Sequence, residues 1–253
     1  VPFCPDAAPA QLLRSLAGDG FFERVPALTR LDAPRGLRHR LPPPEDCGLF
    51  EDHGGWGVDV AAIGAAIEAL GDAGWPPIYV LVYDEVWVMR GRLGHTFRAV
   101  ADLAVNFDFA AFHVRSSGHA RTISAGWAPH RDRDDAAHAG PVSAGFRDGV
   151  PLSATAWIAL SDATPATSCL YCVPKPRDPG YAEGDGGRSP LEACFAAGPS
   201  TFRHVRALPA PAGAVVAFSH RLLHWGSAPD EGAAPRLAVA FGATGAAFGL
   251  HAA

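Results

Sequence analysis

The chain from residue 105 to residue 245 consists of short apolar runs that end at turn signals. The runs are rich in β-branched and aromatic residues, and the chain's 28 Gly and 23 Pro supply many turns between them. Many short strands at close spacing are typical of β-sandwiches and barrels. The expected strands are residues 106–117, 122–132, 152–162, 167–175, 201–208, 213–220, 221–228 and 236–243.

Helical patterns precede these strands. In residues 58–74, Ile63 and Ile67 recur at helical spacing and Gly74 ends the pattern. The other elements expected here are a short amphipathic helix within residues 6–25 that Gly18 and Gly20 end, a loop at 31–57, a short buried strand or extended lead-in at 76–85, and a helix at 85–104.

The order of the elements indicates the fold class. Helices lead, strands follow, and neither an internal repeat nor a linker is visible, so we expect a single domain over residues 1–253. A chain of this length can bury a large core. We therefore predict a mainly β (α+β) fold. Residues 105–245 would form a jelly roll or related barrel, and the mostly helical residues 1–104 would brace one sheet.

Composition argues against two classes of partner. The net charge of −5 and the pI near 6.1 disfavour a nucleic-acid-binding surface, which normally needs a basic stripe. No run of 18 or more apolar residues occurs, so no membrane span is expected. The chain begins with Val rather than Met, which leaves a removed targeting peptide open.

The five cysteines do not form a recognisable metal site. Cys169 and Cys172 make one CxxC, but it falls in an expected strand, where positions i and i+3 point to opposite faces. No second CxxC completes a zinc site. We expect reduced, buried thiols and a cytoplasmic, reducing location.

The stretch "GWAPHRDRDD" at residues 126–135 concentrates charge in a chain that is only 19% charged. In a strand, His130 and Asp132 project from one face and can converge on one ion. A third ligand must come from a neighbouring strand, and the C-terminal region offers His220 and His224. Two histidines and one carboxylate form the facial triad of non-haem Fe(II) oxygenases, which leaves metal positions open.

Arg236 strengthens this interpretation. It follows His224 by twelve residues, after the turn "PDEGAAP", and a hairpin would bring it back toward the metal end. A guanidinium there suits a bidentate pair with a carboxylate. Ser227, a small hydroxyl between the two, is a further candidate for the co-substrate site.

At this point a family resemblance emerges. "HRD" at 130–132, with "AVVAFSHRLLHWGSAPDEGAAPR" at 214–236, resembles the phytanoyl-CoA dioxygenase family of Fe(II)/2-oxoglutarate oxygenases. The resemblance covers residues 105–245. It implies a double-stranded β-helix (cupin-like) core and an HxD…H metal triad that falls on His130, Asp132 and His224. It also implies that Arg236 binds the co-substrate carboxylate.

The resemblance implies an activity as well. Fe(II), 2-oxoglutarate and O2 would hydroxylate a small-molecule substrate, with release of succinate and CO2. Related halogenases replace the triad carboxylate with Gly or Ala, whereas Asp132 is present here. Hydroxylation or another oxidation is therefore expected rather than halogenation.

Several alternatives stay open at this stage. His220 competes with His224 as the distal ligand. His113 and Arg115 could touch the keto acid or substrate, or could be an ordinary polar strand end. The long connections at 133–151 and 175–200 are expected to act as lids or binding elements.

Rival functions are also open. One is a cupin-type metal enzyme that does not use 2-oxoglutarate, and another is a non-catalytic jelly-roll binding protein. A protein-modifying hydroxylase is a third, although no extended peptide-binding or reader domain is visible.

Overall fold

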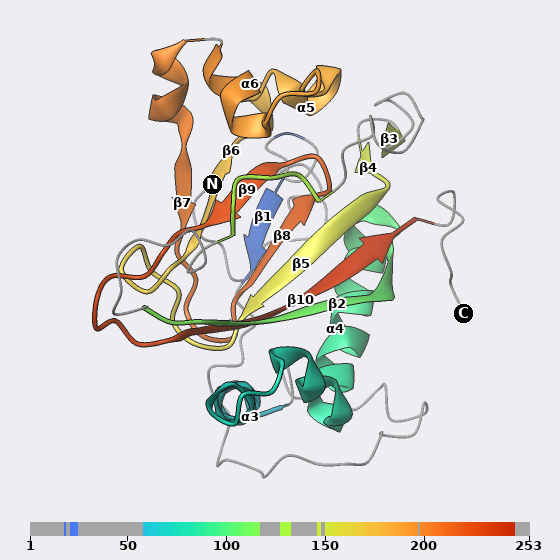
Figure 1. Ribbon diagram of the computed structural model, residues 1–253. Coiled ribbons are helices and arrows are strands. Elements are labelled where there is room, and N and C mark those ends of the chain that lie inside the picture. The colour runs from blue at the N-terminus through green and yellow to red at the C-terminus, as the bar shows by residue number, and fades with distance from the viewer. Residues whose placement is uncertain are drawn as a thin grey trace.

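The computed structural model places two antiparallel sheets against each other and covers the larger one with helices (Figure 1). The residues it describes are 18, 21–24, 58–116, 127–132, 146–147, 150–196 and 198–245.

The larger sheet has five antiparallel strands in the order β1-β8-β5-β10-β2. The long strand β10 lies between β5 and β2 and makes the most extensive pairings. The strands are β1 (Phe21–Arg24), β2 (Ala104–Val114), β5 (Ser153–Ala159), β8 (Val215–Ser219) and β10 (Arg236–Thr244).

The smaller sheet has three strands in the order β7-β6-β9, and a separate two-stranded ladder joins β3 to β4. The strands are β3 (Phe146–Arg147), β4 (Val150–Pro151), β6 (Leu170–Val173), β7 (Arg206–Leu208) and β9 (Leu223–Gly226).

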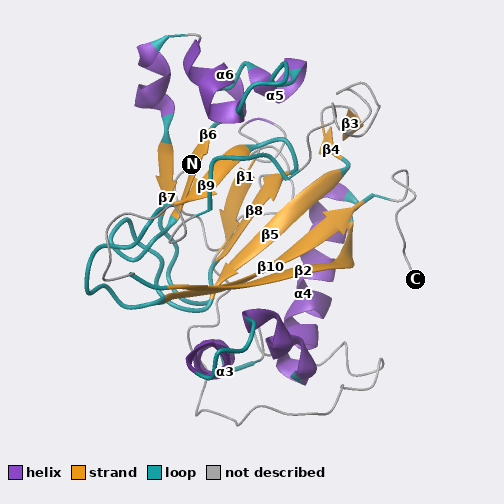
Figure 2. Ribbon diagram, in the orientation of Figure 1, coloured by secondary structure: helices purple, strands orange, loops and turns teal. Residues whose placement is uncertain are grey.

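Helices pack on one face of the five-stranded sheet (Figure 2). They are α3 (Val60–Asp72), the 3-10 helix η2 (Pro77–Val82) and α4 (Asp84–Ala101). Asp59 caps α3 by accepting a hydrogen bond from the Ala62 N–H (3.0 Å). Gly64 lets α3 approach β10 closely, because an added Cβ would lie 3.3 Å from Leu237 Cδ1. The core on this side includes Ile63, Ile67, Met89, Phe97, Ile158, Val215, Val239 and Phe241.

The opposite face of the same sheet packs against the smaller sheet. Because side chains alternate along a strand, β2, β5, β8 and β10 each contribute to both cores. The core between the sheets includes Trp157, Ala159, Leu170, Cys172, Leu208, Val216, Phe218 and Ala238.

A helical segment connects β6 to β7. The sequence predicts a long loop here, whereas the structure contains buried side chains such as Asp178, Tyr181 and Cys194. Its short helices are η6 (Lys175–Arg177), α5 (Gly180–Glu183), α6 (Pro190–Ala196) and η7 (Pro199–His204).

The helices expected at 58–74 and 85–104 are confirmed by α3 and α4. The expectation of a strand or extended lead-in at 76–85 is wrong, since this stretch turns as η2. Pro77 at the first helical position has a fixed φ that suits such a turn. Strand β1 was not anticipated.

Other sequence predictions lie mostly outside the described residues. They are the helix at 6–25, the loop at 31–57, the strand at 122–132 before its last residues, and the loop at 133–151. Within the described part of the chain, Cys169, Cys172 and Cys194 are buried free thiols. No helix described there is both long and apolar enough to cross a membrane.

Candidate active site

The backbone holds His130 and His224 side by side. His130 forms an isolated antiparallel bridge with His224 of β9, and each N–H donates to the other's carbonyl (3.0 and 3.1 Å). Directly paired residues present their side chains on the same face. The two ring centroids are accordingly 4.3 Å apart. Asp132 lies two residues after His130, and so projects to that face as well.

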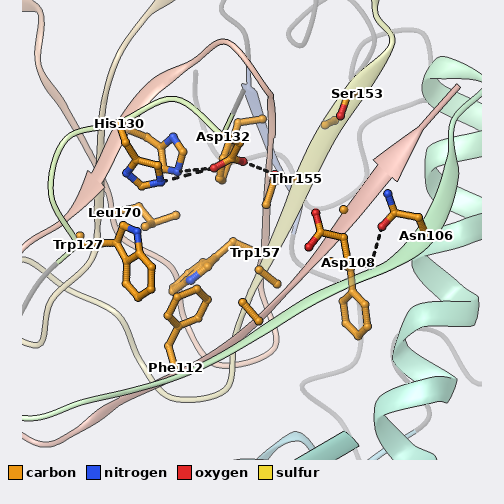
Figure 3. Close-up of a pocket in the computed structure, with 18 of the residues that line it drawn as sticks. Asn106, Asp108, Phe112, Trp127, His130, Asp132, Ser153, Thr155, Trp157 and Leu170 are labelled. Carbon is orange, nitrogen blue, oxygen red and sulfur yellow. Dashed lines mark hydrogen bonds and ion pairs between the residues drawn. The ribbon is translucent and has the colours of Figure 1, made fainter. Parts of the chain in front are cut away.

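The three side chains converge on one point. The Nε2 atoms of His130 and His224 each lie 3.5 Å from Oδ1 of Asp132. One ligand atom from each residue lies within 4.8 Å of the other two. Figure 3 shows the His130 ring turned toward the Asp132 carboxylate. Such separations allow all three atoms to bind a single ion at about 2 Å.

Backbone carbonyls determine which nitrogen of each ring carries the proton. Nδ1 of His130 lies 2.7 Å from the Ala128 carbonyl, and Nδ1 of His224 lies 3.0 Å from the Leu222 carbonyl. A carbonyl can only accept, so Nδ1 donates in both rings. Each Nε2 therefore faces the shared point, where a metal ion would take its lone pair and replace the proton through which His130 bonds Asp132.

The electrostatics of the triad also suit a metal ion. Burial raises the pKa of Asp132, but its hydrogen bond to His130, the nearby His224 and the Thr155 hydroxyl together bring that pKa below its usual value. Burial lowers the pKa of His224. For His130, burial lowers the pKa, but the hydrogen bond to Asp132 and other contacts raise it overall. Thr155 of β5 donates to Oδ2 of Asp132, which leaves Oδ1 directed at the histidines. An ionised carboxylate beside a neutral imidazole is a metal-binding combination.

Arg131, between two of these residues in sequence, points into the protein instead. Its side chain is 1% exposed, and its guanidinium bonds both oxygens of Asp178 (2.6 and 2.9 Å) and both oxygens of Asp185 (2.8 Å each). It also donates to the carbonyl of Arg221 (2.6 Å). The backbone that carries the triad is thus fastened to the segment around α5. We call Arg131, Asp178 and Asp185 the arginine clamp.

A cavity of about 270 Å³ opens beside the triad. Both sheets and the segment 127–132 contribute to its walls. Aromatic side chains dominate one part of the lining, as expected for a small-molecule site. The aromatic lining residues are Phe112, Trp127, Trp157, Phe218 and Phe241, and the polar ones include Asn106, Asp108, Ser153, Thr155 and Arg236.

Arg236 is a buried cation that faces this cavity. It begins β10, is 2% exposed, and lies over the rings of Phe112 (5.7 Å) and Trp157 (5.4 Å). Burial lowers the pKa of its guanidinium to about 10, so the group stays charged at neutral pH. No described residue accepts a hydrogen bond from Arg236 Nε or from the Trp157 indole nitrogen. Buried donors normally have partners, so a ligand with an anionic acceptor fits here.

The structure places His113 and Arg115 away from the cavity, contrary to expectation. Arg115 donates to Nε2 of His113 (2.8 Å) and forms an ion pair with Asp72 of α3. Side chains alternate along β2, and the set facing the cavity is the other one. Its members are Asn106, Asp108, Ala110 and Phe112.

His220 and Ser227 also lie outside the group that the structure brings together. Nδ1 of His220 contacts the Ser153 carbonyl (2.8 Å), while His224 is the histidine beside His130. Ser227 follows β9, where its carbonyl accepts a hydrogen bond from Ser168, and it does not line the cavity.

Sequence reasoning missed several residues of the site. Thr155, which bonds the triad carboxylate, and the two acids of the arginine clamp, Asp178 and Asp185, carry no motif. Asn106 and Asp108 had a usable signal, because they occupy alternate positions of an expected strand.

Comparison of the sequence with family models gives no match, and no curated protein matches significantly. Comparison of the fold with solved structures does find similar proteins. AviO1 from Streptomyces viridochromogenes Tue57 has a TM-score of 0.56 and 17% identity, with 94% of this chain and 95% of that chain covered. SnoN, a non-heme alpha ketoglutarate dependent epimerase from nogalamycin biosynthesis, has a TM-score of 0.54 and 18% identity over 95% and 84% of the two chains.

SnoK, a non-heme alpha ketoglutarate dependent carbocyclase from the same biosynthesis, has a TM-score of 0.53 and 16% identity. That alignment covers 97% of this chain and 88% of SnoK. At these identities the similarity establishes a shared fold.

Proposed function

We propose that this protein is an Fe(II)- and 2-oxoglutarate-dependent oxygenase that acts on a small molecule. The observation that carries the proposal is the buried Arg236 guanidinium, which faces the cavity of the His130, Asp132 and His224 triad without a carboxylate partner among the described residues. A dicarboxylate that reaches from the metal to this arginine would supply the missing anion.

The residues present fit both groups. Two Nε2 lone pairs and one carboxylate oxygen form a donor set typical of non-haem iron, and they leave other metal positions for a chelating acid. Arg236 and the Trp157 indole offer two buried donors on the same cavity wall. SnoN, which shares the fold, has been crystallised with Fe3+, alpha ketoglutarate and nogalamycin RO.

Each residue would have a distinct task in the reaction. His130, Asp132 and His224 would hold the iron, and Arg236 would orient the co-substrate through its distal carboxylate. When bound, Fe(II) and 2-oxoglutarate supply the O2 activation that oxidises the substrate, with release of succinate and CO2. Thr155 keeps the Asp132 carboxylate in one orientation. Phe112 and Trp157 would exclude water from the space around the metal.

We further propose a phytanoyl-CoA dioxygenase-like enzyme that hydroxylates its substrate. The spacing of "HRD", His224 and Arg236 supports a phytanoyl-CoA dioxygenase-like enzyme, and the two facing sheets support a double-stranded β-helix. The carboxylate of Asp132 favours hydroxylation over halogenation. The fold is also used by an epimerase and a carbocyclase, so substrate placement would decide which oxidation follows.

Anaerobic titration tests the proposal directly. Adding Fe(II) and then 2-oxoglutarate to the protein should produce the weak metal-to-ligand charge-transfer absorption of the chelate. His130→Ala and Asp132→Ala should abolish this absorption and succinate formation, while His95→Ala, on the exposed face of α4, should retain both. Wild-type absorption and turnover in Asp132→Ala would refute the proposed triad.

Two rivals give different results in the same titration. A cupin-type enzyme that does not use 2-oxoglutarate would bind the metal but show no change on adding the acid. A non-catalytic binding protein with an inactive site would bind neither. Both rivals leave the buried charge of Arg236 without an explanation.

A further inference from the structure

A β-bulge shapes the end of the cavity away from Arg236. Phe241 of β10 pairs with Phe109, but Ala243 pairs with Val105, so the single residue Gly242 opposes residues 106–108 of β2. A bulge of this kind redirects side chains and is common beside active sites. Asn106 and Asp108, within the bulge, line the cavity like Ala110 and Phe112 at the alternate positions of β2.

Helix α4 supports the bulge from the other face of the sheet. Irregular pairing leaves backbone carbonyls without ladder partners, and Arg90 supplies donors to two of them. Its Nε donates to the Asn106 carbonyl (3.2 Å) and its Nη2 to the Val105 carbonyl (2.8 Å). The guanidinium also lies 4.4 Å from the centre of the Phe107 ring, on that same face. Hydrogen bonds from Arg90 therefore stabilise the bulged backbone of β2.

The missing side chain at Gly242 makes room for the two polar residues. A Cβ added there would lie 2.9 Å from Asn106 Oδ1, 3.0 Å from Asp108 Cβ and 3.1 Å from Asp108 Oδ2. Asn106 Oδ1 accepts a hydrogen bond from the Asp108 N–H (2.8 Å), which leaves the amide NH2 of Asn106 available. Asp108 is exposed while it lines the cavity, and no hydrogen bond or ion pair to its carboxylate is found among the described residues.

The position of Asp108 relative to the metal site follows from the strand register. Gly242 also pairs with Thr155 of β5, the residue that bonds Asp132. Residues 106–108 of β2 thus lie two strand spacings, about 10 Å, from Thr155 across the sheet. Arg236 lies six residues back along β10, roughly 20 Å at the strand rise. Figure 3 shows the Asp108 carboxylate on the Thr155 side of β2.

We infer that Asp108 selects the substrate of the proposed oxygenase by accepting hydrogen bonds from a hydroxyl or amine group of that substrate, while the free amide NH2 of Asn106 donates to the same substrate. A carboxylate or phosphate at this place would be repelled by Asp108. The same repulsion keeps the distal carboxylate of 2-oxoglutarate at the Arg236 end. This inference rests on the proposed function, because it assumes that the substrate occupies the cavity beside the metal.

A matched set of ring compounds tests the selection. Each ring is prepared with a hydroxyl, a primary amine or a carboxylate, and binding is followed by ligand-observed NMR. The protein is loaded with 2-oxoglutarate and Zn(II), a redox-inert ion that replaces Fe(II). The variants are Asp108→Asn and Asp108→Lys, and Asp102→Asn is the control. Asp102 is an exposed carboxylate at the αL end of α4, where Asn is well tolerated.

Hydroxyl or amine compounds should bind the wild-type protein and the control, and carboxylates should not. Asp108→Asn should weaken that binding about tenfold or more, and Asp108→Lys should shift the preference to carboxylates. If Asp108→Asn weakens the binding of the amine compounds only, the group that Asp108 recognises on the substrate is an ammonium. If it weakens the binding of the hydroxyl compounds, that group is a hydroxyl. The same ranking in the wild type and both variants would overturn the inference, as would no binding of any compound to the wild type.

The anaerobic Fe(II) titration separates this failure from failure of the proposed function. If 2-oxoglutarate binds to the iron-loaded wild type and to both Asp108 variants, only the substrate inference is at stake. If the iron-loaded wild type does not bind 2-oxoglutarate at all, the proposed function itself is refuted.

Discussion

Arg131 and Arg236 are both buried, yet their surroundings differ in kind. Arg131 lies in the arginine clamp, where two carboxylates and one carbonyl surround its guanidinium. Arg236 lies in the cavity wall between two aromatic rings and has no carboxylate partner among the described residues. The pKa of Arg131 is raised overall, because its partners outweigh the effect of burial, whereas burial lowers that of Arg236.

The presence or absence of counterions inside the protein separates a buried side-chain charge that stabilises the fold from one that is available to a ligand. A buried ion with its counterions inside the protein is part of the fold, and removing one partner is costly. A buried ion that faces a cavity without a counterion is a cost to the free protein, which a bound anion can offset. Variants at the two arginines and at the glycines beside them test this contrast.

The largest effect is expected for Arg131→Met. The substitution leaves Asp178 and Asp185 buried without their cation, which should lower the free energy of unfolding by about 3–5 kcal/mol. Urea unfolding would measure the loss. Arg188→Met, at an exposed position of the same segment, is the control and should be close to the wild type. Equal stability of the two variants would show that the clamp is not structural.

Arg236→Met should have the opposite profile. The free protein should be as stable as the wild type or more stable, because a buried charge without a partner is removed. Affinity for 2-oxoglutarate should fall about 100-fold, the effect of losing a buried charge pair. Anaerobic titration gives the affinity and thermal unfolding gives the stability. Unchanged affinity would mean that Arg236 does not bind the co-substrate.

A glycine lies beside each arginine, and the pair offers a steric test. A Cβ at Gly180 would lie 2.2 Å from Asp185 Oδ1 and 2.5 Å from Arg131 Nη2, while one at Gly226 would lie 3.6 Å from Arg236 Nη2. Gly180→Ala should therefore cost about 1–3 kcal/mol of stability, and Gly226→Ala clearly less. Thermal unfolding of both would measure this. A tolerated Gly180→Ala would mean that the clamp can relax.

The smallest effect is expected for Arg236→Lys. Lysine keeps the charge but loses the planar fork that suits a carboxylate, so 2-oxoglutarate affinity should fall only about tenfold. The same titration measures it. A loss as large as that of Arg236→Met would show that fork geometry, more than charge, determines binding.

Periodicity in the sequence predicted much of the fold. Strand β2 shows what periodicity could not predict, namely which face of a strand lines the cavity. The alternation correctly groups Phe109, Ala111 and His113 on one face. Both faces of β2 are covered, one by helices and one by the cavity wall. Alternation alone therefore could not tell which set faces the site, and the polar pair His113 and Arg115 was the wrong choice for the cavity.

The candidate metal ligands were predictable because a short motif and one spacing contain them. The arginine clamp was not, because Asp178 and Asp185 lie 47 and 54 residues from Arg131 in a stretch rich in Gly and Pro. The charged run "HRDRDD" has the composition of a solvated loop. Only the tertiary structure shows that one of its arginines is buried.

The arginine clamp also limits how this protein can be re-engineered. Exchanging the connection between β6 and β7 for that of a relative is an obvious way to change its chemistry. A graft that starts after Asp185 keeps both acids, whereas one that starts before Asp178 removes them and leaves Arg131 buried without its carboxylate partners, between the candidate ligands His130 and Asp132. The safe splice point is therefore at residue 186, well inside what composition alone marks as a free loop.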